Sequence, residues 1–163
     1  MNRKPLVLVD GEYTQMPVGD LIDPACLPEP EAPPAVDFSL VELENDTAFT
    51  RPILTPVYVK SNGKFADADT DTNQKADVVG LTVESIASAA SGDVKTSGPI
   101  EATTAQWDAQ TGGSGGLVAG SDYYLRATGG LSATPAGPHV VKLGKAVSST
   151  KLLLRVEPPV FIG

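Results

Sequence analysis

The sequence predicts an all-β fold, a small β-barrel or β-sandwich body with one short helix, preceded by an extended, proline-rich N-terminal arm. Glycine (16 residues) and proline (14 residues) are frequent in this chain of 163 residues, which favours many turns and short helices. Short apolar segments recur with turn signals about every 8–12 residues, a spacing typical of sandwiches and small barrels. We therefore expect an arm over residues 1–46 and a body over residues 47–163.

The charge is divided unevenly along the chain. Residues 1–50 contain ten acidic and two basic residues, whereas residues 51–163 contain ten of each. A neutral body argues against nucleic-acid binding, which needs a basic surface, and an acidic arm is repelled by anionic lipid. We expect no nucleic-acid or membrane partner. Cys26 is the single cysteine, so no internal disulfide can form, and no secretory signal peptide is expected at Met1–Val9.

The arm is predicted to begin with a β-hairpin and to continue as an extended strap. Leu6–Val9 and Glu12–Met16 flank Asp10-Gly11, a pair suited to a two-residue turn. Pro17–Pro34 contains six prolines together with acidic residues, which favours an extended course or disorder. Its spaced apolar residues suit a strap laid across another protein surface.

The body is predicted as a series of strands. Residues 35–46 alternate in polarity and suit an edge strand. A hairpin is expected around Asn62-Gly63, followed by a strand over Val78–Ile86, a turn at Ser91-Gly92-Asp93 and a strand over Val94–Ile100. The later strands are expected over Ser121–Ala127, over His139–Leu143 and before Pro158-Pro159.

The segment "QWDAQTGGSGGLVAGSDYYL" contains the only tryptophan, four closely spaced glycines and two tyrosines. A short helix is expected over Ala105–Gln110, capped by Thr103 or Thr104 and ended by Gly112. Trp107 on this helix could cover an open end of a barrel. Tyr123 and Tyr124 should point to opposite faces of the next strand, one inward and the other outward, as a contact between subunits or a partly exposed surface residue.

The segment "DADTDTNQKAD" is the strongest candidate metal site, because Asp67, Asp69 and Asp71 have the spacing of a calcium-binding loop. Thr72 stands where such a loop needs glycine, and Val78 where it needs a bidentate glutamate. A solvated, charged loop is therefore the expected structure, and no metal or cofactor is expected.

The sequence does not predict an enzyme. His139 is the only histidine and is expected to make a structural hydrogen bond. The glycines after Trp107 lead into a strand and not into the helix of a phosphate-binding loop. The sequence does not decide whether two carboxylates are paired for glycoside cleavage, because it does not give the distance between carboxyl groups.

Three segments carry a resemblance to virion surface proteins of tailed bacteriophages: "TTAQWDAQTGGSGGLVAGSDYYL", "ATGGLSATP" and "VVKLGKAVSSTKLLLRVEPPVFIG". The N-terminal "KPLVLVDGEYTQMPVGDLID" is similar to the head of phage tail-fibre and capsid-decoration proteins. The resemblance implies a trimeric β-structured protein, made in the host bacterial cytoplasm, that coats a capsid or forms part of a fibre. The chain has no coiled-coil heptads and no repeated shaft, which favours a compact cement protein over a long fibre.

We therefore expect a capsid decoration protein whose partners are the phage major capsid protein and further copies of itself. A tail-fibre or baseplate adaptor and a calcium-dependent carbohydrate-binding module are the alternatives. The residues expected to contact the capsid are apolar anchors and acidic partners of the arm: Leu6, Val7, Leu8, Asp10, Glu12, Asp20, Leu21, Ile22, Asp23 and Leu27.

Overall fold

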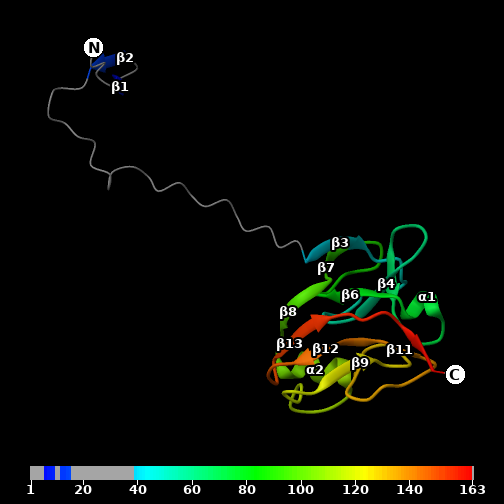
Figure 1. Cartoon of the computed structure of the whole chain (residues 1–163). Helices are drawn as coiled ribbons and strands as arrows, with labels where there is room; N and C mark the ends of the chain where they lie inside the picture. Colours follow the sequence, from blue (N-terminus) through cyan, green and yellow to red (C-terminus); the bar gives the residue numbers. More distant parts are fainter. Residues whose placement is uncertain (1–5, 10–11, 16–38, 163) are drawn as a thin grey trace. The chain divides into compact units, whose positions relative to one another are not determined.

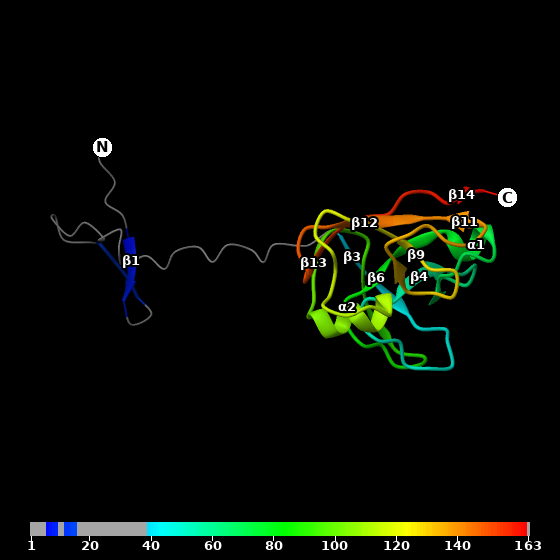
Figure 2. The same cartoon turned by 90° about the horizontal axis from the view of Figure 1, so that it is seen from below.

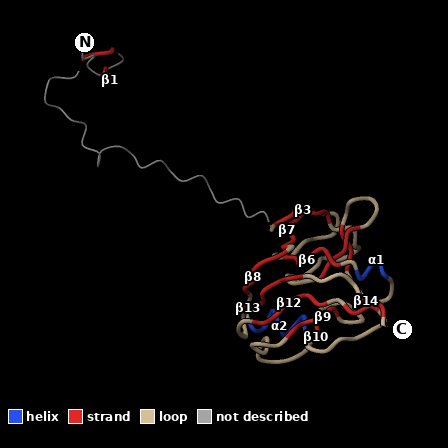
Figure 3. Tube along the Cα trace, in the orientation of Figure 1, coloured by secondary structure: helices blue, strands red, loops and turns tan. Residues whose placement is uncertain are grey.

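The computed structural model describes residues 6–9, 12–15 and 39–162. The chain divides into two units, Met1–Val36 and Asp37–Gly163. The predicted all-β class is confirmed, because antiparallel sheets dominate the described residues (Figures 1 and 3). The strands do not close a barrel, and the larger unit is a sandwich-like arrangement of two sheets.

The first unit contains the predicted hairpin. Strands β1 (Leu6–Val9) and β2 (Glu12–Gln15) are antiparallel, and Val9 pairs with Glu12. This register leaves two residues for the connection, in agreement with an Asp10-Gly11 turn. Asp10, Gly11 and the proline-rich strap lie outside the described residues.

The first sheet of the larger unit has the strand order β3 (Leu40–Glu44), β7 (Ser91–Lys95), β6 (Val78–Thr82), β4 (Pro56–Val59) and β5 (Phe65–Asp67). Strand β3 is the edge strand that the sequence predicts. It pairs with β7 along its whole length, so this unit begins before residue 47, the boundary expected from the sequence. A single bridge joins Asn45, the residue after β3, to Phe65 at the start of β5, without the run of paired residues that would close the sheet into a barrel.

The second sheet has the order β10 (Leu131–Ser132), β9 (Asp122–Leu125), β12 (Lys142–Ala146), β13 (Lys151–Arg155) and β8 (Ser97–Glu101). In Figure 1 its strands occupy the lower part of the larger unit, below β3, β7 and β6. Strands β11 (His139–Val140) and β14 (Val160–Phe161) form a separate two-stranded sheet close to the C-terminus (Figure 2).

Two predicted strands are each divided in the structure. The strand expected over Val94–Ile100 is β7 and β8, interrupted at Thr96 where the chain passes from the first sheet to the second. The strand expected over His139–Leu143 is β11 and β12, which also belong to different sheets. The local sequence does not reveal such a change of sheet, because it depends on which distant strands each half pairs with.

The predicted turn at Ser91-Gly92-Asp93 is wrong, because these residues begin β7. The turn lies at Ser88 and Ala89, and Ala89 has a positive φ of 59°. Gly92 is needed for close packing: a Cβ atom there would lie 2.6 Å from Ile86 Cγ1. The preceding strand also ends at Thr82, short of the predicted Ile86.

The predicted helix is α2 (Thr104–Thr111). Thr103 caps its N-terminus with a capping box to Gln106, and Gly112 ends it in the left-handed conformation. A second helix of one turn, α1 (Asn73–Ala76), was not predicted. Its polar residues carry no apolar periodicity, and it depends on a cap from Thr72 Oγ1 to the Lys75 amide, 3.3 Å away.

The main core draws its side chains from both sheets and from α2. Its largest members are fully or almost fully buried: Trp107, Leu54, Leu81, Leu125, Leu131, Leu143, Leu152 and Leu154. A smaller core of Val57, Phe65, Ile86 and Val94 lies within the first sheet and its connecting loops. Strand β4 is buried on both faces, because Pro56, Val57 and Tyr58 are buried without interruption.

Candidate functional site

The predicted capsid-binding residues fall in the first unit. Leu6, Val7, Leu8 and Glu12 lie on β1 and β2, whose pairing is described. The remaining predicted contacts, Asp10, Asp20, Leu21, Ile22, Asp23 and Leu27, lie outside the described residues. Their role in capsid binding stays a prediction.

Trp107 and Tyr123 are core residues of the larger unit. Trp107 is 0% exposed and its indole nitrogen donates a hydrogen bond to Thr150 O at 3.0 Å. Tyr123 is the inward tyrosine, and its hydroxyl accepts a hydrogen bond from the Val118 amide at 2.9 Å. Tyr124 is half-buried on the opposite face of β9, so it is the one residue of these three that is available for a contact between copies.

The glycine-rich loop after α2 is held by Asp108. Its two carboxylate oxygens accept hydrogen bonds from the amides of Gly115 (3.0 Å) and Gly116 (2.7 Å). Gly116 has a φ of +81°, and a Cβ atom there would lie 2.3 Å from Ser149 O. Within the "WDAQTGGSGG" motif, Asp108 holds the loop and Gly116 allows its close packing against the β12–β13 connection.

The three aspartates of the candidate calcium loop do not converge. Asp67 lies against Arg51, with 2.8 Å between its Oδ1 and the arginine Nε. Asp69 and Asp71 both pair with Lys75, at 2.8 and 3.5 Å. Within residues 39–162 no group of three His, Cys, Asp or Glu side chains is arranged to hold a metal ion. A lysine occupies the position that a cation would take between Asp69 and Asp71.

A cavity of about 210 Å³ lies where the first sheet, the end of α2 and the β9–β10 turn meet. We call it the arginine cleft. Its polar lining comes from all three elements: Arg51, Thr55, Asp67, Gln110, Arg126 and Gly129. No pattern in the sequence indicates this cleft, because its lining residues are brought together only by the packing of the two sheets.

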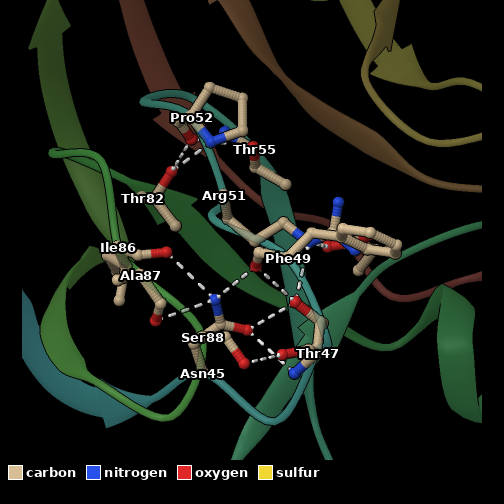
Figure 4. Close-up of polar contacts among 11 residues, drawn as sticks. Asn45, Thr47, Phe49, Arg51, Pro52, Thr55, Thr82, Ile86, Ala87 and Ser88 are labelled. Carbon is tan, nitrogen blue, oxygen red and sulfur yellow. Dashed lines mark hydrogen bonds and ion pairs between the residues drawn. The ribbon is translucent and has the colours of Figure 1, made fainter.

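Arg51 is positioned by the loop that follows β3 (Figure 4). Its Nε donates a hydrogen bond to Thr47 Oγ1 at 3.0 Å. Its backbone amide donates to Ile86 O, and its backbone carbonyl accepts from the Ile86 amide. The guanidinium also lies over the exposed ring of Phe49, 5.8 Å from the ring centroid. The contacts with Thr47 and Phe49 thus hold the side chain at the cleft, and the backbone pairing holds the segment that carries it.

Asn45 organises the same loop from inside (Figure 4). It is buried, and its amide nitrogen donates to the carbonyls of Phe49 and Ile86, each at 3.0 Å, and of Ala87 at 3.1 Å. Its Oδ1 accepts from the Thr47 amide at 2.9 Å. One side chain therefore joins the loop that carries Arg51 to the turn before β7.

Replacement of Asn45 by alanine is expected to lower the free energy of unfolding by about 2 kcal/mol, because buried carbonyl groups lose their donor. Urea denaturation followed by circular dichroism measures the change. Asn62→Ala, in the exposed β4–β5 turn, is the control and should cost less than about 1 kcal/mol. Equal losses in the two variants would contradict the assigned role of Asn45.

The charges of the cleft are only partly neutralised. Burial raises the pKa of Asp67 above its ordinary value of 3.8, and the nearby Arg51 guanidinium opposes this shift. The folded protein therefore binds more protons than the unfolded chain at pH values between 3.8 and the folded pKa. The contribution of this carboxyl to stability falls as the pH rises through that window.

We expect the carboxyl carbon of Asp67 to titrate above 3.8 in a carbon-detected NMR titration of the folded protein. Asp122 is the internal control, because its hydrogen bond with Lys142 holds its pKa below 3.8. A titration of Asp67 at or below the midpoint of Asp122 would contradict the described burial.

The C-terminal strand β14 presents an exposed apolar segment, Val160, Phe161 and Ile162. Phe161 packs on the ring of His139 with 5.2 Å between centroids, and His139 Nδ1 lies 2.9 Å from Thr70 O. The predicted structural hydrogen bond of His139 is confirmed. The histidine anchors one side of this segment and leaves the other side exposed.

No protein-family model matches the chain, and no curated protein matches it either. Within the described ranges, no helix has the length and the apolar character that crossing a membrane requires.

Proposed function

We propose that this chain is a structural virion protein, a capsid decoration protein that binds the outside of a phage capsid and bridges its major capsid protein subunits. The observation that carries the proposal is the segregation of charge. Residues 1–50 hold ten acids against two bases, and residues 51–163 are neutral. The sequence resemblance to phage virion surface proteins supports the same function.

The proposed mechanism assigns different tasks to the two units. Residues 16–36, which follow the β1–β2 hairpin, can span up to about 75 Å when fully extended, a length sufficient to reach a neighbouring shell subunit. Its apolar anchors would bury surface worth roughly 25 cal/mol per Å². Its carboxylates would face basic patches on the shell, so attachment should weaken as salt is added.

We propose that the larger unit forms the part of a homotrimer that faces away from the capsid. Tyr124 lies on the outer face of the second sheet, and Leu153 on β13 is exposed on the same sheet. Side chains of this kind are suited to contacts between copies. The trimer itself rests on the sequence resemblance.

The test is a mass measurement of the purified protein alone and after mixing with empty, expanded capsid shells, at low and at high salt. We expect a trimeric mass for the free protein and saturable binding to shells that falls as salt rises. Absence of binding to expanded shells at low salt would refute the proposed function.

A further inference from the structure

The arginine cleft has more hydrogen-bond donors than the protein supplies with acceptors. The Arg51 side chain is only 22% exposed, and its Nε is used by Thr47 and Asp67. Within residues 39–162 its described hydrogen bond and ion pair both involve Nε, and neither involves its two terminal nitrogens. A guanidinium carries five N–H donors in a planar fork, so four of them are left for other acceptors.

Arg126 is the second arginine that lines the cleft. One terminal nitrogen donates to Thr111 O, and its other donors have no acceptor in the described part of the chain. Gln110 has one neutral donor left for a ligand, because one of its two amide N–H groups is engaged by Ile53 O at 3.0 Å. The unsatisfied groups of the cleft are thus mainly cationic donors.

Asp67 sets the charge that a ligand must have. Its Oδ1 is shielded from solvent and accepts no well-aligned hydrogen bond, since the nearest donor, the N–H of Arg51 Nε, is directed at Thr47. Two arginines and one ionised aspartate give the cleft a net charge of +1. A group with a single negative charge balances it, whereas a dianion would leave the occupied cleft with a net charge of −1.

We propose that the arginine cleft binds a carboxylate group. A carboxylate is planar, carries one negative charge and accepts paired N–H bonds from a guanidinium. The volume of about 210 Å³ is below the range of about 300–1,000 Å³ that is common for sites of drug-sized ligands, so the ligand is a small acid or an acidic side chain of another protein.

The experiment uses the full chain labelled with ¹⁵N and follows the resonances of Gly129, Gly130 and Arg51 Nε. The probes are propionate, its neutral counterpart propionamide, and the blocked peptide acetyl-Gly-Glu-Gly-amide. We expect saturable shifts with propionate or with the peptide, and none with propionamide. Stronger binding of the peptide would assign the site to a protein side chain, and stronger binding of propionate to a small acid; both results uphold a carboxylate site.

Three variants locate the binding in the cleft. Arg126→Gln should weaken binding about tenfold, because it removes a charged donor. Asp67→Asn should strengthen it by roughly threefold to tenfold, because it removes the repulsive charge and leaves both arginines in place. Lys145→Gln, on the outer face of the second sheet, is the control and should change nothing.

The opposite effects of Arg126→Gln and Asp67→Asn cannot both arise from partial unfolding. Equal shifts with propionamide and propionate, or the absence of saturable shifts with both carboxylates, would overturn the proposal. Binding that is unchanged in Arg126→Gln would do the same.

Discussion

Replacement of Trp107 by alanine is expected to lower the free energy of unfolding by about 3–5 kcal/mol. Trp107 is the largest side chain of the main core and is 0% exposed, so its removal leaves a cavity between α2 and the second sheet. It also leaves Thr150 O without the indole N–H. Urea denaturation followed by far-ultraviolet circular dichroism measures the loss without depending on the tryptophan signal.

Two further variants separate the parts of this effect. Trp107→Phe keeps an aromatic ring and should lose less than the alanine variant, about 1–3 kcal/mol, for the missing hydrogen bond and the smaller volume. Val118→Ala changes a side chain that is 63% exposed and should cost less than about 0.5 kcal/mol. If Trp107→Ala cost no more than Val118→Ala, the described core would be wrong.

A chain that begins at Asp37 is expected to remain folded and to bind expanded capsid shells at least 100-fold more weakly than the full chain. Burial of two leucine side chains alone contributes about 3 kcal/mol or more, which corresponds to a factor of about 100 in affinity. The start at Asp37 keeps β3, which pairs with β7 along its whole length. Co-sedimentation with shells measures binding, and circular dichroism confirms that the shortened chain is folded.

Two full-length variants separate apolar from electrostatic attachment. A variant with Leu6, Val7 and Leu8 changed to serine should bind weakly at every salt concentration. A variant with Asp20→Asn and Asp23→Asn should lose part of the salt dependence of binding and retain the contribution of apolar burial to affinity. Full affinity in the chain that begins at Asp37 would contradict the role assigned to the arm.

Local signals were sufficient to predict several elements of the fold. The Thr103 cap and the Gly112 terminus of α2 are read from adjacent residues, as are the β1–β2 hairpin and the Asn62-Gly63 turn between β4 and β5. The alternation of polar and apolar residues over residues 35–46 predicts an edge strand, and β3 lies at the edge of the first sheet. In these cases the physical cause lies within a few residues of the element.

The features that were missed depend on contacts between distant segments. Gly92 was predicted in a turn, but its lack of a side chain serves the packing of Ile86. Asn45 reads as an ordinary polar residue after a strand, and its burial becomes evident only when the turn at Ala87 lies beside it. Arg51 lies between β3 and β4 and Arg126 follows β9, so no spacing in the sequence indicates their common cleft.

Cryo-electron microscopy of a phage virion assembled with this protein is the decisive measurement of the proposed position on the head. We expect density for the sandwich unit on the outer surface of the head, with further density that runs from it across adjacent capsid subunits. Density for this unit confined to the tail or the baseplate, with a bare head, would refute the proposed capsid decoration.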